Sequence, residues 1–142
     1  MSFRSYLSTL DESGELVHIT TPVSKTLEIA GILKKLEPNP VLFENVKESP
    51  FPVVGNLFCS KPSLARAFQV PVPGLIPLLI DAIQHHRPAQ IVTQAPCQEI
   101  ILTNPDLDEL PVLKHCANDG GNYISAGVMI ADHRQRWNPH VA

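Results

Sequence analysis

The apolar positions at the start of the chain follow a helical spacing and then an extended one. Between Phe3 and Leu10 they recur at intervals of three and four residues, which predicts one apolar face of a short helix. Gly14 follows, and a glycine at that place suits the left-handed residue that ends many helices. The stretch 15–20 then predicts a strand.

A second helix is predicted over 27–36, where leucine and isoleucine recur with helical spacing. Ser24 or Thr26 can cap its first turn, because a hydroxyl oxygen there accepts a hydrogen bond from a free backbone N–H. Pro38 then ends the helix, since proline cannot donate the next backbone hydrogen bond. The apolar run 41–43 predicts a short buried strand.

The next part of the chain repeats this alternation. Residues 52–57 predict a strand, and Ser60 opens a third helix that runs to Phe68 with a proline in its first turn. Residues 71–74, with two prolines and a glycine, predict a turn. A fourth helix is predicted over 75–86.

A change in character after Pro111 predicts a domain boundary. Strands alternate with helices up to a strand at 98–103, which indicates a small α/β domain. Beyond a glycine-rich turn, Tyr123–Asp132 is the longest strand candidate, and no helical pattern follows it. We therefore predict an α/β domain over 1–118 and the start of a β-rich domain over 119–142. Because a strand so near the last residue needs partners, we expect the sequence to be incomplete.

The core of the α/β domain is expected to form from the apolar face of each element. Finding most of these side chains exposed would contradict the α/β fold. The residues expected to be largely buried are Leu16, Ile29, Leu33, Leu42, Phe43, Val53, Val54, Leu64, Phe68, Leu79, Ile83, Ile100 and Leu102.

Composition excludes several classes of protein. A hydrophobic fraction of 44% and a charged fraction of 18% indicate a folded soluble chain. A net charge of -3 argues against a nucleic-acid partner, which needs a basic face. Cys59, Cys97 and Cys116 are odd in number and widely spaced, which favours a reducing cytoplasm over a disulfide framework. The sequence has neither a signal peptide nor an apolar run long enough for a transmembrane segment.

The cysteines and histidines give little indication of chemistry. Cys97, His115 and Cys116 lack the spacing of zinc ligands, because two adjacent residues cannot easily both reach one ion. Cys59 and Cys97 are instead expected to be small buried hydrophobic residues. The pair His85–His86 is interpreted as a helix C-terminus, where a protonated imidazole complements the helix dipole.

Two polar stretches near the C-terminal end have alternative interpretations. The acidic turn 106–109 is interpreted as a solvated loop with capping potential rather than as a metal cluster. Asn138 and His140 are more suggestive, because an amide oxygen and an imidazole close together can serve a hard cation or a phosphate. Asn138 also precedes Pro139, and an Asn-Pro pair commonly forms a turn.

Three segments of the chain carry distinctive motifs. The segments are 3–16, which ends in Gly-Glu-Leu, then Leu-Phe-Glu-Asn-Val-Lys at 42–47 with Phe-Pro-Val-Val-Gly-Asn-Leu-Phe at 51–58, then 96–99, 108–113 and Asp-Gly-Gly-Asn-Tyr-Ile-Ser-Ala-Gly at 119–127. They span nearly the whole chain, and the second is the most specific. In this order they resemble the UbiD decarboxylase family.

The resemblance implies a fold and an activity. Family members have an N-terminal α/β domain, a central split β-barrel of the flavin-reductase type, and a C-terminal domain used in assembly. They use prenylated FMN with manganese and potassium to decarboxylate aromatic or α,β-unsaturated carboxylic acids. The modified flavin accepts the electrons left when carbon dioxide departs, and the protein supplies binding, orientation and a proton donor. By this resemblance we expect a small-molecule carboxylic acid as substrate and a homo-oligomer in the cytoplasm.

The resemblance also implies cofactor-binding residues. The family's motif has an Asn that ligates the metal, followed by an Arg near the flavin. Asn138 stands in the metal-ligand place, and His140, Val141 and Ala142 would run along the flavin and its phosphate. Pro139 and His140 depart from the residues commoner there.

One further residue and several missing ones complete this expectation. Ser125 stands where many family members carry a Thr that lines the cofactor pocket. The motif's Arg, the further metal ligands (a His and a Glu) and the pair of catalytic glutamates lie downstream in the family. No catalytic residue is therefore assigned here, and we expect the chain alone to be inactive.

A rival interpretation belongs to another class of protein. The chain could be a stand-alone, non-catalytic α/β module used in interaction or assembly. Reading the coding sequence past Ala142 would distinguish the two, because it shows either an Arg and a long extension or a stop codon.

Overall fold

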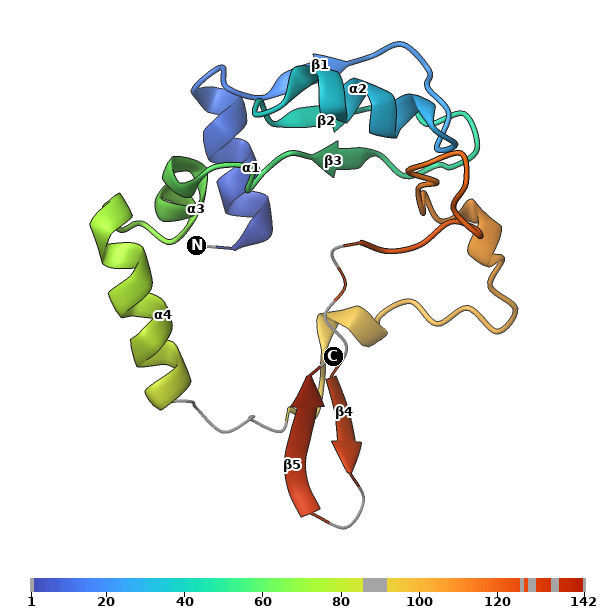
Figure 1. Cartoon of the computed structure of the whole chain (residues 1–142). Helices are drawn as coiled ribbons and strands as arrows, with labels where there is room; N and C mark the ends of the chain where they lie inside the picture. Colours follow the sequence, from blue (N-terminus) through green and yellow to red (C-terminus); the bar gives the residue numbers. More distant parts are fainter. Residues whose placement is uncertain (1, 86–91, 126, 128–129, 134–135, 142) are drawn as a thin grey trace.

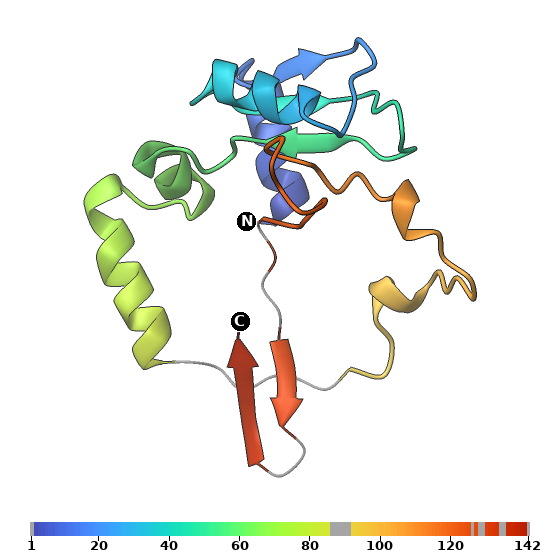
Figure 2. The ribbon, with the colours of Figure 1, turned by 45° about the vertical axis from the view of Figure 1, so that its right-hand side comes forward.

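The computed structural model describes residues 2–85, 92–125, 127, 130–133 and 136–141. Helices and a small sheet occupy the N-terminal part, and a two-stranded hairpin lies near the C-terminal end (Figure 1). Between them the chain runs out along α4 and returns to the sheet before it reaches the hairpin (Figures 1 and 2).

Helix α1, Phe3–Glu12, forms where the helical spacing predicted it. Ser2 and Ser5 form a reciprocal capping box at its start, and this box satisfies backbone donors that the first turn leaves free. Tyr6 and Leu10 are buried on its inner face. Gly14 follows with a φ of 71°, which confirms the left-handed cap.

Three short strands form a mixed sheet in the order β1-β2-β3. Strand β1 (Val17–Ile19) pairs in parallel with β2 (Val41–Phe43), and β2 pairs antiparallel with β3 (Val53–Gly55). Helix α2 (Glu28–Leu36) provides the crossover that a parallel pair requires. The predicted alternation of strand and helix is therefore confirmed in this part of the chain.

The sheet is covered on both faces, because successive side chains of a strand point in opposite directions. Val41 and Phe43 pack with Ile29 of α2 in one buried cluster. Leu42 of β2 and its partner Val54 of β3 point to the opposite face of the sheet. They pack against a second cluster that contains Tyr6 and Leu10 of α1. The result is a three-layer arrangement with α1 and α2 on opposite sides of the strands (Figure 1).

The start of α2 differs from the prediction. Neither Ser24 nor Thr26 caps the helix; the cap position is Leu27, which has a φ of 67° and no side-chain cap bond. The hydroxyl of Ser24 instead accepts a hydrogen bond from the backbone N–H of Thr26. The backbone carbonyl of Ser24 accepts from the N–H of Ile29, so a tight loop replaces the hydroxyl cap.

Helix α3 (Lys61–Ala67) begins after Ser60, as predicted, and Ser60 and Ser63 form a second capping box at its start. The phenol of Tyr6 donates a 3.0 Å hydrogen bond to the Ser63 carbonyl, and this bond joins α3 to α1. A single 3-10 turn, η1 (Val72–Gly74), leads into α4 (Leu75–Gln84).

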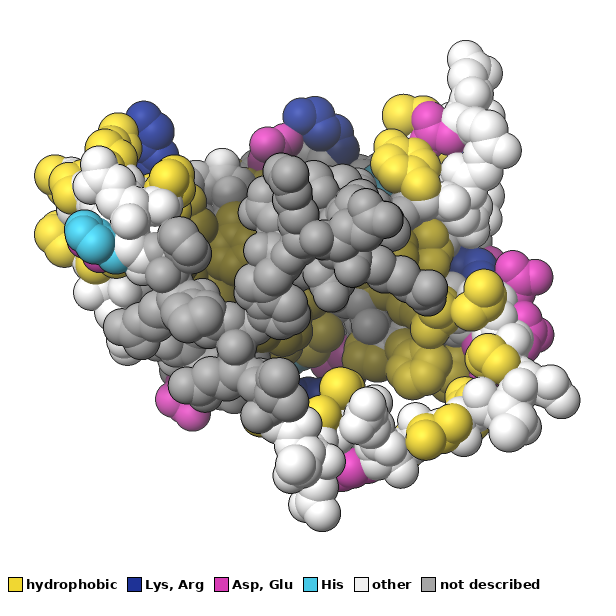
Figure 3. Space-filling view, turned by 90° about the horizontal axis from the view of Figure 1, so that it is seen from below, with side chains coloured by type: hydrophobic (Ala, Val, Ile, Leu, Met, Phe, Trp, Pro, Cys, Tyr) yellow, Lys and Arg dark blue, Asp and Glu magenta, His cyan; other side chains and the backbone are white. Residues whose placement is uncertain are grey.

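The predicted core is correct for the sheet and wrong for the later elements. Phe43 and Ile29 are fully buried, and Leu16 is 7% exposed. Five other predicted core residues are exposed. One lies at the end of α3, and the other four lie on α4 or in the chain after it, which stand away from the sheet (Figure 1). Figure 3 shows hydrophobic side chains at several places on the face seen from below. The exposed residues are Phe68, Leu79, Ile83, Ile100 and Leu102.

Two predicted strands differ from the structure. The stretch 98–103 is not a strand: η2 (Pro96–Gln98) precedes it, and Ile100 and Leu102 extend into solvent. Tyr123–Asp132 is not one long strand either, since 123–125 are irregular and β4 covers Ile130–His133. A strand persists only where a neighbour accepts its backbone hydrogen bonds, and β4 finds one in β5 (Arg136–Val141).

The structure thus confirms an α/β N-terminal domain with a small mixed sheet. A two-stranded hairpin follows it, and the split barrel and the boundary at 118 remain predictions. Among the residues that the structure describes, no single helix is long and apolar enough to cross a membrane. Lys61–Ala67 and Val72–Gln84 pass that test only as a pair bent by 76°.

Candidate functional site

Ser125 lies at a cavity on the underside of the sheet. The cavity has a volume of about 690 Å³ and is lined by β3, by the residues that follow it, and by part of α2. Leu113, His115 and Ser125 close it from the segment that returns to the sheet. A cavity of this size is within the range of small-molecule sites.

The lining is mostly apolar, with a few polar and charged side chains. Leu33, Val53 and Val54 supply aliphatic surface, while Asn56, His115 and the Lys34–Glu37 ion pair supply polar groups. Such a lining can hold a flat apolar group and orient it through a small number of hydrogen bonds. The cavity itself therefore indicates binding rather than bond making.

The cysteine at this cavity is not a thiolate nucleophile. Partial burial of its sulfur, aided by the nearby Glu37 carboxylate, raises the pKa of the Cys59 thiol. A thiol with a raised pKa is neutral near pH 7 and is a poor nucleophile. Cys59 and Cys97 are exposed, so the prediction that they are buried is wrong. Cys59 lies on a loop and Cys97 lies in the 3-10 turn η2, and both are solvated because they are outside the two buried clusters.

The segment that carries Ser125 is held against the N-terminal domain by its backbone. Thr26 and Lys114 form a parallel bridge, in which the N–H of Leu27 donates to the Lys114 carbonyl at 3.0 Å. Further along, the N–H of Tyr123 donates to the Leu113 carbonyl at 3.2 Å. Ser125 follows two positions later, so its position depends on these bonds.

The remaining predicted site residues lie on the hairpin. Asn138, His140 and Val141 all belong to β5, where His140 pairs with Ala131 and Val141 pairs with Ile130. Asn138 thus lies within a strand, which contradicts the turn interpretation of the Asn-Pro pair: the β4–β5 ladder holds that stretch extended. Ala142 lies outside the described residues.

Ser125 and the predicted site residues of β5 lie on different elements. Ser125 lines the cavity beneath the sheet, whereas the β4–β5 hairpin lies away from the sheet in both ribbon views (Figures 1 and 2). The described residues contain no group of three or more His, Cys, Asp or Glu side chains that could hold a metal ion. The side chains described here therefore do not fit a metal centre by themselves.

The other polar stretches have the structural roles that the sequence indicated. Asp106 caps η3 (Leu107–Glu109) by accepting from the N–H of Asp108. His85 is the C-cap residue of α4, and its Nδ1 lies 3.0 Å from a carboxylate oxygen of Asp81. These residues stabilise helix ends.

Sequence reasoning missed two contributors to the site. Asn56 and His115 line the same cavity as Ser125, although neither was predicted as a site residue: Asn56 appeared only within a family motif, and His115 was considered only as a zinc ligand. The signal for Asn56 was its place in the Gly-Asn-Leu-Phe motif directly after a predicted strand. His115 gave no such signal, because only the return of its segment brings it beneath β3.

Comparison with known families gives the class of the protein. Residues 7–83 match the 3-octaprenyl-4-hydroxybenzoate carboxy-lyase N-terminal domain, and residues 90–142 match the Rift-related domain of the same carboxy-lyase. The chain belongs to the UbiD carboxy-lyase family.

Individual relatives agree with this assignment. The chain is 34% identical to the anhydromevalonate phosphate decarboxylase of Methanosarcina mazei, with 99% of this chain and 32% of that protein covered. It is 30% identical to the enzyme of the same name from Methanothermobacter thermautotrophicus, with 90% of this chain and 29% of that protein covered. The chain therefore spans about a third of the length of these relatives.

Solved structures show the same fold. An evolved dimeric form of the UbiD-class enzyme HmfF from Pelotomaculum thermopropionicum, in complex with prFMN, superposes with a TM-score of 0.90. The identity is 34%, and the match covers 99% of this chain and 34% of that one. The vanillic acid decarboxylase of Sedimentibacter hydroxybenzoicus shares the fold at 24% identity and a TM-score of 0.75.

Proposed function

We propose that this chain is the N-terminal part of a non-oxidative carboxy-lyase that acts on aromatic or α,β-unsaturated carboxylic acids through prenylated FMN. The observation that carries the proposal is the continuous likeness to HmfF, which extends over 99% of the chain and comes from an enzyme solved with prFMN. Both domains of the match are ones that carboxy-lyases of this family contain.

The cavity at Ser125 supports a role in holding the flavin. Its aliphatic lining offers apolar surface to a flat ring, and the Ser125 hydroxyl can donate or accept one orienting hydrogen bond. Prenylated FMN, when bound, supplies the electron sink that decarboxylation requires. In this proposal β5 contributes His140, Val141 and Ala142 along the flavin and its phosphate.

For the metal ion, we propose only one ligand from this chain. Asn138 would supply one amide oxygen to Mn²⁺, a type of ligand that hard cations accept. Because the described residues contain no cluster of acidic, histidine or cysteine ligands, the other ligands must come from elsewhere in the enzyme. Potassium and a homo-oligomeric, cytoplasmic enzyme are proposed on the family resemblance alone.

The rival function, a stand-alone interaction module, has less support. A module kept only for binding has no need of the Rift-related segment, yet residues 90–142 match that domain of the carboxy-lyase. The apolar cavity at Ser125 also has the character of a small-molecule site.

The coding sequence past Ala142 provides the test. The polypeptide read from it is expressed with a supply of prenylated FMN, and its flavin absorbance and metal content are measured after purification. Loss of carbon dioxide is then followed with aromatic and α,β-unsaturated acids, anhydromevalonate phosphate included. Bound flavin with decarboxylation is the expected result, and a flavin-free, inactive polypeptide would overturn the proposal.

The companion measurement is a titration of prenylated FMN and Mn²⁺ into the purified 142-residue chain, followed by the flavin spectrum. We expect neither the flavin nor Mn²⁺ to bind it tightly, because one amide cannot replace the several ligands that such a cation needs. Tight stoichiometric binding would mean that the cofactor site is more local than proposed.

A further inference from the structure

The loop before α2 contacts a segment that is remote in sequence. The Lys114 N–H donates to the Lys25 carbonyl at 3.1 Å, directly beside the bridge between Thr26 and Lys114. Ser49 lies at the same contact, and its hydroxyl donates to the Glu109 carbonyl at 2.6 Å. Backbone bonds and side-chain bonds together thus hold the returning segment to the N-terminal domain.

Lys25 contributes the one ammonium group in this contact within the described residues. Its Nζ donates to the backbone carbonyls of Asp108 and Leu110, the latter at 3.2 Å. These carbonyls lie at the end of η3, and the Leu110 carbonyl also accepts from the backbone N–H of Val112 at 2.8 Å. A charged donor makes stronger hydrogen bonds than a neutral one, so the ammonium fixes the turn against the loop.

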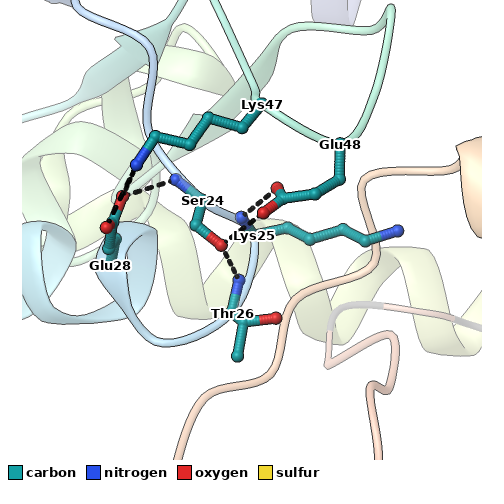
Figure 4. A network of polar contacts seen from close by, with 6 residues as sticks. All are labelled: Ser24, Lys25, Thr26, Glu28, Lys47 and Glu48. Atoms are coloured by element: carbon teal, nitrogen blue, oxygen red, sulfur yellow. Dashed lines mark hydrogen bonds and ion pairs between the residues drawn. The ribbon is translucent and has the colours of Figure 1, made fainter.

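Lys25 is itself held in place from the opposite side. The carboxylate of Glu48 accepts from the Ser24 hydroxyl at 2.6 Å and from the Lys25 backbone N–H at 2.9 Å (Figure 4). These two bonds, the side-chain bond first, lower the pKa of the Glu48 carboxyl, so the group stays ionised near neutral pH. Glu28 extends the same network, because its carboxylate accepts from the Ser24 backbone N–H and from the Lys47 ammonium (Figure 4).

The contact between Lys25 and the returning segment also affects the position of Ser125, because the backbone connects the two. Beyond the contact, Leu113 packs against the core cluster that contains Phe43. The Asn122 amide donates to the Val112 carbonyl at 2.9 Å, and Tyr123 donates to Leu113, so the chain folds back on itself before Ser125. Moving residues 108–114 would therefore move Ser125 relative to β3.

We propose that Lys25 is a positioning residue for the cavity at Ser125. Its ammonium fastens segment 108–114 to the loop before α2 and so sets where Ser125 and His115 stand beneath β3. Its effect on the flavin rests on the proposed function, whereas its effect on the segment does not.

Amide hydrogen exchange in the 142-residue chain tests the structural step. In Lys25→Met, which keeps the length of the side chain and removes its donors, the amides of Lys114 and Tyr123 should exchange roughly tenfold faster. Those of Val17 and Glu44, bonded within the sheet region, should not change. Lys25→Arg should restore the protection, because it restores a charged donor.

Lys47→Met is the matched control, since Lys47 belongs to the same network and bonds to Glu28 instead. It should leave the exchange of the Lys114 and Tyr123 amides unchanged. Unchanged exchange at these two amides in Lys25→Met, or a change of equal size in Lys47→Met, would overturn the positioning role.

The effect of Lys25 on the flavin is tested in the polypeptide that is read from the coding sequence past Ala142. The quantity measured is the flavin that this polypeptide retains after purification. Lys25→Met should reduce retained flavin several-fold, and Lys25→Arg should recover it. Faster exchange with undiminished flavin would overturn the link to the cofactor. A wild-type protein without flavin would overturn the proposed function, while the exchange result would still decide the role of Lys25.

Discussion

The side-chain amide of Asn56 donates a 2.8 Å hydrogen bond to the backbone carbonyl of Leu33, and it ties the end of β3 to α2. Asn56 has a φ of 59°, in the left-handed region where asparagine is tolerated better than most residues. Both the conformation and the bond explain why an asparagine follows Gly55. The same residue lines the cavity at Ser125, so the packing of the sheet on α2 and the shape of the cavity depend on it.

Asn56→Ala should therefore destabilise the chain by about 1 to 2 kcal/mol. Alanine loses the bond to Leu33, which is a cost of about 1 kcal/mol, and it tolerates the left-handed backbone less well than asparagine, whose polar side chain can hydrogen-bond locally, which adds up to about 1 kcal/mol. The free energy of unfolding in urea measures the loss. Asn56→Gly is the control, because glycine accepts this φ and loses only the bond. An alanine variant as stable as the glycine variant would contradict the account.

Phe43→Ala tests the core between the sheet and α2. Phe43 is 0% exposed, so its truncation leaves a cavity and should lower the free energy of unfolding by about 3 to 5 kcal/mol. Phe51→Ala provides the comparison, since Phe51 is 48% exposed and should cost less than about 1 kcal/mol. Equal losses in the two variants would show that Phe43 is not part of the core.

His18 lies between two carboxylates on the surface. Its Nδ1 is 2.7 Å from Glu44 and its Nε2 is 2.9 Å from Asp11. Both ring nitrogens can donate only when the imidazole is protonated, and the hydrogen bond to Glu44, followed by that to Asp11, raises the pKa of His18.

A raised pKa in the folded state fixes the direction of the pH dependence. The stabilisation by His18 is fully present below its unfolded pKa, about 6.5, and is lost as the pH rises through the folded value. His18→Ala should thus lower the free energy of unfolding more at about pH 5.5 than at about pH 8.5. The Asp11→Asn, Glu44→Gln double variant is the control and should abolish the difference. The reverse trend with pH would contradict the model.

The elements that the sequence predicted best are those with local signals. Ser60 with a following proline, Gly14 after an amphipathic run and the apolar stretch 41–43 each specify an end or a face by short-range chemistry. The structure confirms all three. The site residues Ser125 and Asn138 were assigned by family resemblance and not by local spacing; Ser125 lines a cavity, and the cofactor roles of both residues stay predictions.

The features that the sequence did not predict correctly share a physical cause: each depends on contacts with residues that are remote in the sequence. Ile100 and Leu102 have the composition of a strand, yet the described residues offer no neighbouring strand to pair with them. Ile83 lies on an apolar helix that stands away from the sheet. The contact of Lys25 with Asp108 joins residues far apart in the sequence, and no local spacing indicates it.

The last prediction concerns Asn138 in the polypeptide read past Ala142. Asn138 lies in β5, so it is not a turn residue, and a neutral amide oxygen suits a hard cation. If it bridges the metal to the cofactor phosphate, Asn138→Ala should lower the affinity for Mn²⁺ and the retained flavin together, by at least about tenfold. Metal analysis and the flavin spectrum of the purified protein measure both quantities, and circular dichroism checks the fold.

Asn138→Asp separates the ligand role from a purely structural one. Aspartate keeps an oxygen ligand and adds a charge, so it should retain the metal better than alanine does. The same charge repels a neighbouring phosphate, and flavin should be lost more than metal. A residue needed only for the β4–β5 pairing would give two variants that lose neither group, or that lose both equally along with the strand signal. Unequal loss of metal and flavin in Asn138→Asp, with the fold intact, is the result that the ligand role requires.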